Sequence, residues 1–190
     1  MTNAWEQRKL GDEIADIVGG GTPSTSIEEY WDGDIDWYSP TEIGKSAYVG
    51  KSNKQITLLG LEKSSAKVLP PYKTILFTSR AGIGDMAILT KEAATNQGFQ
   101  SLVVNEEYDP YFIYSLGFKI KRYALKMASG STFLEISAKG LSKMKIACPS
   151  YEEQSCIGSF FSELDQLITL HQRKPVLVYH LANQKLRKTR

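Results

Sequence analysis

Hydrophobic and polar residues alternate over short runs through most of the chain, and the period changes after Pro149. Short runs rich in β-branched residues and bounded by Gly, Pro, Ser or Asn are typical of strands. Four such runs occur, at residues 73–80, 85–90, 100–105 and 143–149. Apolar residues recur at near-helical spacing over residues 109–128, which predicts one or two helices interrupted near Gly117. With a short helix expected over 137–144, residues 1–149 are predicted to form a mixed α+β domain.

A different pattern begins at Ser150 and predicts a long helix over residues 150–174. Ser150 and Glu153 have the spacing of a capping box, in which the serine hydroxyl accepts the backbone N–H of the glutamate. Apolar residues then recur at alternating intervals of four and three. The predicted row comprises Ile157, Phe161, Leu164 and Ile168 and continues to His171, with Phe160 and Leu167 widening it. Such a row is typical of a helix that packs along a second helix, although a terminal helix lying on its own domain also produces it.

Pro175 is expected to end or kink this helix, because proline lacks a backbone N–H and its ring clashes with the preceding turn. The remaining residues, 175–190, are first apolar and then basic. They form either a second helical piece or a solvated end. The basic residues of this tail, which could instead contact nucleic acid, are Lys185, Arg187, Lys188 and Arg190.

Composition and charge narrow the class of protein only slightly. The 190 residues are 42% hydrophobic and 23% charged, which is typical of globular chains and excludes wholesale disorder. The net charge of +2 argues against a purely electrostatic DNA-binding protein, but a local basic patch is sufficient for DNA binding. Residues 1–20 lack the pattern of a secretory leader, and no run of about 18 apolar residues occurs, so a cytoplasmic protein without a membrane span is expected. Cys148 and Cys156 are expected to be reduced core residues rather than joined in a disulfide or bound to a metal.

Motifs that would indicate catalysis are incomplete. The triple glycine at 19–21 is not followed by the Gly-Lys-Ser/Thr of a phosphate-binding loop, so it is interpreted as a turn that needs positive φ. The sequence GIGDMA at 82–87 precedes a predicted strand, whereas a dinucleotide site needs a helix there. His171 and His180 are not part of a recognisable nucleophile motif. The sequence therefore predicts neither a catalytic nor a metal site in this chain.

Basic, aromatic, amide and hydroxyl side chains instead gather in predicted loops that are rich in Gly, Ser and Asn. Arg and Lys bind guanine or phosphate, Asn and Gln pair with adenine, and hydroxyls do either. The candidate DNA-binding residues are Arg80, Gln97, Gln100, Lys45, Tyr48, Lys51, Ser131 and Thr22.

Five stretches follow one another in a specific order. They are WEQRKLGDEIADIVGGGTPS, YWDGDIDWYSPTEI, ILFTSRAGIGDMAI, ATNQGFQSLV and GSTFLEISAKGLSKMKIACPSYEEQSCIGSFFSELDQLITLHQRK. In this order they resemble the specificity (S, HsdS-type) subunit of type I restriction-modification enzymes. The resemblance covers about residues 5–174 and places a target recognition domain at 1–149, a spacer and dimerisation helix at 150–174, and a basic tail at 175–190.

The resemblance implies a subunit that reads double-stranded DNA and performs no chemistry itself. Such subunits carry two recognition domains, and their two helices pair as an antiparallel coiled coil. Their partners are modification subunits, which use S-adenosylmethionine to methylate adenine, and motor-nuclease subunits, which use ATP and Mg²⁺. This chain has one domain and one helix, so the resemblance implies a homodimer that reads a palindromic split target. The alternatives are a decoy that occupies modification subunits without reading DNA, and a standalone methyltransferase or nuclease.

Overall fold

The computed structural model describes residues 5–130 and 134–188, with side chains up to residue 171. A five-stranded sheet forms its centre, in the order β2-β9-β6-β7-β4. The bounds of these strands are Ala15–Gly19 for β2, Gln100–Val104 for β9, Thr74–Phe77 for β6, Met86–Leu89 for β7 and Tyr48–Val49 for β4. Neighbouring strands are antiparallel except β4, which runs parallel to β7.

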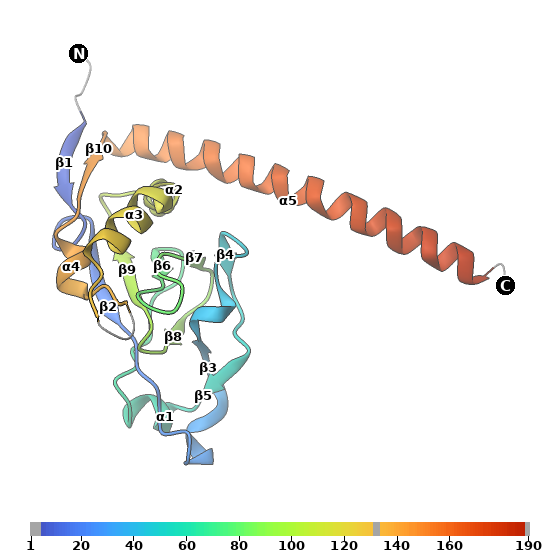
Figure 1. Cartoon of the computed structure of the whole chain (residues 1–190), viewed down its shortest axis with the longest axis horizontal. Helices are drawn as coiled ribbons and strands as arrows, with labels where there is room; N and C mark the ends of the chain where they lie inside the picture. The colour runs from blue at the N-terminus through green and yellow to red at the C-terminus, as the bar shows by residue number, and fades with distance from the viewer. Residues whose placement is uncertain (1–4, 131–133, 189–190) are drawn as a thin grey trace.

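A smaller sheet of three strands lies beside the first, at the end of the domain that is farther from the long helix (Figure 1). Its order is β5 (Lys54–Ile56), β3 (Trp31–Tyr38) and β8 (Ala93–Thr95), with β3 parallel to β8. The short helices around it are η1 (Glu28–Tyr30), η2 (Pro40–Glu42) and α1 (Leu58–Glu62). Trp37, Ile56, Ala66 and Ala94 form a separate core beneath it, where the rings of Trp31 and Trp37 meet edge to face.

Three helices pack on the central sheet, and the first of them along the chain also packs against the long helix (Figure 1). They are α2 (Pro110–Ser115), α3 (Gly117–Met127) and α4 (Ala138–Ser142). Their apolar faces join the main core, in which Phe77 of the sheet and Phe112, Ile113 and Ile120 of the helices are almost fully buried. Each of these side chains contributes about 1.5–3 kcal/mol by leaving water, so this core supports the loops that the sheet carries.

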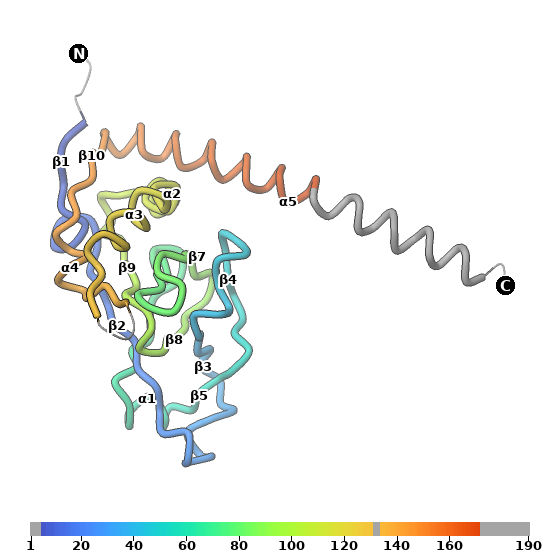
Figure 2. Tube along the Cα trace, in the orientation of Figure 1, coloured from blue at the N-terminus to red at the C-terminus, as the bar shows by residue number. Residues whose placement is uncertain are grey.

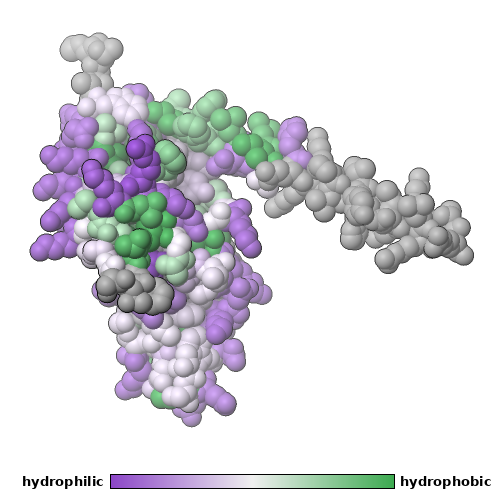
Figure 3. All heavy atoms as spheres, in the orientation of Figure 1, coloured by the Kyte–Doolittle hydropathy of each residue, from purple (hydrophilic) through white to green (hydrophobic). Residues whose placement is uncertain are grey.

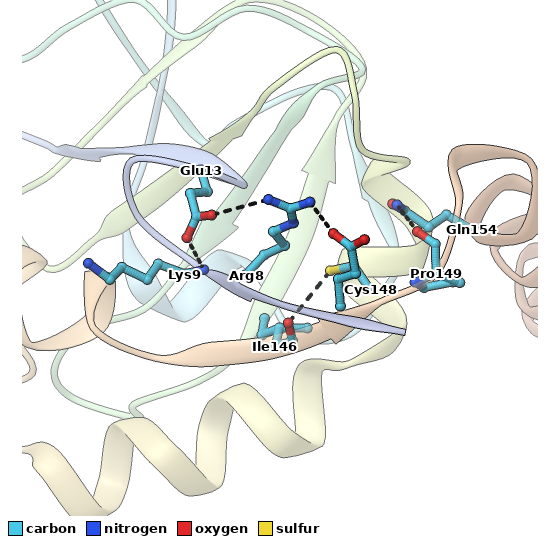
Figure 4. A network of polar contacts seen from close by, with 8 residues as sticks. Arg8, Lys9, Glu13, Ile146, Cys148, Pro149 and Gln154 are labelled. Atoms are coloured by element: carbon cyan, nitrogen blue, oxygen red, sulfur yellow. Dashed lines mark hydrogen bonds and ion pairs between the residues drawn. The ribbon is translucent and has the colours of Figure 1, made fainter. Parts of the chain in front are cut away.

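A two-stranded antiparallel sheet joins the beginning of the domain to its end. Strand β1 (Glu6–Lys9) pairs with β10 (Lys145–Cys148), and Figure 2 shows the two side by side where the long helix begins. Polar contacts surround this junction (Figure 4): Glu13 accepts the backbone N–H of Lys9 at 2.7 Å, and the Gln154 amide donates to the carbonyl of Pro149 at 3.0 Å. The base of the long helix is therefore attached to both ends of the domain.

The elements confirm the mixed α+β fold and most of the strands and helices that the sequence predicts. Strands β6, β7, β9 and β10 lie in the four predicted runs, and α4 lies within 137–144. The predicted break near Gly117 is found at Leu116, which separates α2 from α3.

The long helix α5 (Tyr151–Lys188) continues through Pro175, so the expectation that the helix ends at this proline is wrong. A proline inside a helix costs about 3 kcal/mol, mainly through one lost hydrogen bond and a local clash, and the helix of 38 residues continues past that local defect. At its start, the Ser150 hydroxyl accepts the backbone N–H of Glu153 at 3.4 Å, as predicted. The Glu153 carboxylate accepts the indole N–H of Trp5 at 3.1 Å. This hydrogen bond attaches the helix to the N-terminal segment.

The triple glycine is needed for close packing and not for positive φ. The left-handed glycines of the described chain are Gly44, Gly82, Gly84 and Gly130. A Cβ on Gly20 would lie 2.1 Å from the carbonyl oxygen of Asn96, and one on Gly21 would lie 2.3 Å from the Ser65 hydroxyl. Only glycine allows these backbones to approach so closely, and the interpretation of this stretch as a positive-φ turn is therefore wrong.

Replacing Gly20 by alanine is expected to lower the free energy of unfolding by about 3 kcal/mol, because the new methyl group collides with backbone oxygens that cannot rotate away. The matched control is Gly19→Ala, whose Cβ would meet only the Gln100 amide, at 3.7 Å, and which should change stability by about 0.5 kcal/mol or less. Urea denaturation followed by circular dichroism measures both. Equal stability of the two variants would contradict the packing argument.

Candidate nucleic-acid interface

Three of the predicted DNA-binding residues meet on one surface, although they are far apart in the sequence. The Thr22 hydroxyl donates to the side-chain oxygen of Gln97. A Cβ on Gly98 would lie 3.5 Å from Nε of Arg80, so the guanidinium lies next to the turn that carries Gln97. A hydroxyl, an amide and a guanidinium therefore form one group, called here the reading cluster: Thr22, Arg80 and Gln97.

Long-range backbone hydrogen bonds hold the loops of the reading cluster together. The N–H of Ser79 donates to the carbonyl of Gly98 at 2.8 Å, and the N–H of Asn96 donates to the carbonyl of Tyr38 at 3.0 Å. The backbone of Arg80 also pairs with that of Glu135 in an isolated antiparallel β-bridge. These contacts fix the backbone on both sides of the cluster, so its side chains project from a pre-organised surface.

The turn that carries Arg80 is tight because three of the four positions after it have positive φ. Ala81, Gly82 and Gly84 have φ values of 50°, 112° and 93°. The hydroxyl of Thr78 closes the turn, donating to the carbonyl of Gly82 at 2.6 Å and accepting the N–H of Asp85 at 2.9 Å. The glycines of GIGDMA thus shape a loop between two strands, in agreement with the rejection of a dinucleotide site.

Gln100 lies apart from this surface. It is half-buried at the start of β9, opposite Gly19, and its side-chain oxygen is buried and has no hydrogen-bond partner among the described atoms. The structure therefore does not place Gln100 in the reading cluster, and its contact with DNA stays a prediction. Ser131, another predicted residue, lies outside the described residues.

Lys45 and Tyr48 belong to a second site. They line a cleft of about 480 Å³ between the β4 segment and α5, opposite Asp165 and Ile168. The rings of Tyr48 and Tyr111 are 5.8 Å apart at this cleft. The structure therefore does not place Lys45 and Tyr48 in the reading cluster.

Lys51 is exposed on the segment that precedes β5. Two residues later, the N–H of Asn53 donates to the Glu42 carboxylate at 2.6 Å, and Glu42 also accepts the backbone N–H of Ser39 at 2.8 Å. These bonds attach the Lys51 segment to the 38–42 loop. That loop contributes the Tyr38 carbonyl that positions Asn96.

Sequence reasoning missed a basic stripe on α3, defined here as Lys119, Arg122 and Lys126. All three are exposed, and their spacing places them on one face of a helix that contains no acidic residue. Beyond α3, Ser129 exchanges two backbone hydrogen bonds of 3.1 Å with Glu135, which is bridged to Arg80. These pairings connect the segment after α3 to the segment of Arg80. The stretch GFKIKRYALKM could have revealed the stripe through its helical spacing.

The predicted apolar row on α5 is only partly free. Ile157 packs against the main core of its own domain, and Phe161 lines a groove with Phe118 of α3. The remaining large side chains, Phe160, Leu164, Leu167 and Ile168, are exposed, and Figure 3 shows hydrophobic residues along this part of the helix. The first four turns of the helix therefore pack on the domain with one side and leave an apolar face, called here the free row, without a partner.

The remaining candidate groups carry no chemistry that can be identified in the described part of the chain. Cys148 and Cys156 are both free thiols, and burial raises the pKa of the Cys148 thiol to about 11. Cys156 is exposed on α5, contrary to the expectation of two core cysteines. Over the described residues no three His, Cys, Asp or Glu side chains gather in a metal-binding group, and no helix could cross a membrane.

The mixed α+β domain presents amide, hydroxyl and basic side chains on loops that backbone hydrogen bonds hold in place. It also carries a long helix with an exposed apolar face. These two features define a recognition module attached to a helical arm. The family model for the type I restriction modification DNA specificity domain matches residues 3–179. The chain belongs to this family of DNA specificity subunits of type I restriction-modification systems.

Relatives and solved structures agree with the assignment. The chain is 35% identical over 183 residues to the type I restriction enzyme MjaIX specificity subunit of Methanocaldococcus jannaschii, covering 94% of this chain and 42% of the relative. It is 33% identical over 171 residues to the EcoR124I/EcoR124II specificity subunit of Escherichia coli, covering 85% of this chain and 41% of the relative.

In fold, the chain is similar to the HsdS subunit from Thermoanaerobacter tengcongensis, with a TM-score of 0.66 at 20% identity over 90% of this chain and 39% of that subunit. A TM-score of 0.69, also at 20% identity, relates it to a chain from a study of complex assembly and conformational transition in the type I restriction-modification system, covering 90% of this chain and 40% of that one. The protein thus spans less than half the length of the relatives that it matches.

Proposed function

We propose that this chain reads one half-site of a split DNA target and contains no catalytic site of its own. The observation that carries the proposal is the convergence of Thr22, Gln97 and Arg80 in the reading cluster. These side chains supply the donors and acceptors that distinguish base edges in the major groove. Because backbone hydrogen bonds already hold these loops in place, little conformational entropy is lost when they bind DNA.

The free row supports a homodimer in which two copies of α5 pair as an antiparallel coiled coil. Phe160, Leu164, Leu167 and Ile168 are 37–58% exposed in the chain. Exposed apolar residues at heptad-like spacing are typical of a face that a second helix covers. With two-fold symmetry, the two domains read the same half-site in opposite directions, so the target is palindromic.

The dimer is proposed to recruit modification subunits that methylate adenine with S-adenosylmethionine, and motor-nuclease subunits that use ATP and Mg²⁺. This chain itself holds no cofactor in the proposal. Its role is to present a chosen DNA sequence to subunits that carry the chemistry.

The experiment that tests this function uses the chain co-purified with its modification subunit. The complex is incubated with a random DNA library and S-adenosylmethionine, and methylated molecules are selected and sequenced. A palindromic pair of half-sites with a fixed spacing is the expected result. Binding to the modification subunit without selective methylation would contradict DNA reading and identify a decoy, whereas methylation by the isolated chain would identify an enzyme.

The basic stripe on α3 is assigned to DNA phosphates in this proposal. Replacing Lys119, Arg122 and Lys126 together by glutamine is expected to weaken binding to all DNA sequences alike. It should also reduce the slope of log K against log salt by about 2–3, since each phosphate contact contributes about 0.9. Fluorescence anisotropy over a range of salt concentrations measures this slope. A changed sequence preference, or an unchanged slope, would contradict the assignment.

A further inference from the structure

The first four turns of α5 are attached to α2 and to the residue that precedes it, at three levels along the helix. Gln154 is 2% exposed, and its side-chain oxygen accepts the N–H of Asp109 at 3.2 Å. One turn later, Gly158 packs so closely that a Cβ would lie 2.3 Å from a carboxylate oxygen of Asp109. Two turns further, the Tyr111 hydroxyl donates to the Asp165 carboxylate at 2.6 Å.

The contact between Tyr111 and Asp165 is the outermost of the three. Asp165 is itself exposed, and an open cleft of about 480 Å³ separates the next turn of α5 from the β4 segment. Tyr111, by contrast, belongs to the main core, and its ring contacts those of Tyr48 and Tyr114 at 5.8 and 5.3 Å. A rigid side chain of the domain therefore holds the helix at the point where the helix leaves the domain.

The hydroxyl is protonated in the physiological range. Burial, together with the hydrogen bond to Asp165, raises the pKa of Tyr111. The phenol therefore remains a hydrogen-bond donor to Asp165 at the pH at which DNA is bound.

We propose that the hydrogen bond between Tyr111 and Asp165 sets the angle at which α5 leaves the domain, and thereby selects the number of base pairs between the two half-sites. Tyr111 and Asp165 are then positioning residues that determine spacing and not base sequence. The inference rests on the proposed homodimer.

The length of α5 explains why a single contact is sufficient to change the spacing between the half-sites. The 38 residues of α5 span about 57 Å at about 1.5 Å per residue, and roughly 34 Å of this length lies beyond Asp165. A tilt of about 6° at Asp165 displaces a point 34 Å away by about 3.5 Å, close to the rise of about 3.4 Å per base pair. A small change of angle therefore changes the preferred spacing by about one base pair.

The test applies the library selection to four variants in complex with the modification subunit. Tyr111→Phe removes the donor and Asp165→Ala removes the acceptor. Asp165→Asn retains an amide oxygen that can accept the same hydrogen bond, and Glu163→Ala is the matched control, an exposed acid on the same helix. Tyr111→Phe and Asp165→Ala are expected to keep the half-site sequences and to broaden or shift the spacing by about one base pair. Asp165→Asn and Glu163→Ala should keep the wild-type spacing.

Small-angle X-ray scattering of the same variants without DNA measures the arrangement of domain and helix directly. A changed scattering profile for Tyr111→Phe and Asp165→Ala, with Asp165→Asn close to wild type, supports the proposal. Unchanged profiles and unchanged spacing in the first two variants would overturn it. If the wild-type chain selects a single half-site, the homodimer is wrong, and the scattering profiles still decide whether this contact sets the helix angle.

Discussion

Replacing Leu164 by glutamate is expected to convert the proposed homodimer into monomers. Leu164 lies in the middle of the free row. Because a two-fold interface uses the same surface of both protomers, the substitution introduces two glutamates into it. Burial of one leucine contributes about 1.5–3 kcal/mol, so two lost leucines, together with two charges that must be desolvated, weaken the dimer by about 4 kcal/mol or more. This corresponds to a Kd raised on the order of 1000-fold. Light scattering at micromolar concentration measures the mass.

The control for this substitution is Ser159→Glu, which adds the same charge to another exposed position of the same helix, away from the free row. Ser159→Glu should keep the dimer, and circular dichroism should show that both variants retain their helix content. If the wild-type chain is already a monomer, or if Leu164→Glu has the mass of a dimer, the free row does not mediate pairing.

Replacing Arg80 and Gln97 together by alanine is expected to remove most of the sequence preference of the assembled enzyme. Each bidentate base contact contributes about 1–3 kcal/mol of discrimination, and the proposed homodimer would make each contact twice. The loss of both residues is therefore expected to reduce selectivity by a factor on the order of 1000, while non-specific binding changes little. Competition binding against the selected target and a scrambled DNA measures the ratio.

Lys9→Ala is the control for the reading cluster. Lys9 is an exposed cation on β1, at the junction with α5 rather than on the loops of the cluster. It should retain both affinity and selectivity. An Arg80→Ala/Gln97→Ala complex that still methylates only the selected target would show that other residues read the bases.

The sequence predicts the strands that form apolar runs of four or five residues and misses the shorter or more polar ones, such as β8 (Ala93–Thr95) and β3. In β6 and β7 every residue is buried, and both are short apolar runs with a clear signal. The sequence of β3, WDGDIDWY, alternates apolar residues with Asp32, Asp34 and Asp36. This period of two is itself a strand signal, but the acids and Gly33 disguise it, because these residues are depleted in strands.

The reading cluster could be predicted only as separate candidates. Nothing in the local sequence indicates that Ser79 bonds to Gly98, and this long-range contact is what brings Arg80 beside Gln97. Gln97 and Gln100 are equivalent in the local sequence, since both lie in a polar stretch, yet Gln97 precedes strand β9 whereas Gln100 is its first residue and pairs with Gly19.

The apolar row of α5 shows a second limit of prediction from the sequence. Helical periodicity identifies apolar positions but does not say which neighbour covers each of them. Because α5 faces both its own domain and a free side, Ile157 belongs to the core while Leu164 and Leu167 are exposed. The interpretation as a helix lying on its own domain is therefore confirmed for Ile157, while pairing with a second helix stays a prediction for the exposed positions.

The pairing of β1 with β10 means that the polypeptide enters and leaves the domain at a single point, next to the first turn of α5. Residues between these two strands form a cassette whose ends lie side by side. Exchange of this cassette for another with the same pair of terminal strands keeps the base of the helix in place only when the new cassette also supplies the contacts of Asp109 and Tyr111 with α5. Under the proposed function, one exchanged gene segment then carries a new target sequence while the sequence of α5 stays unaltered.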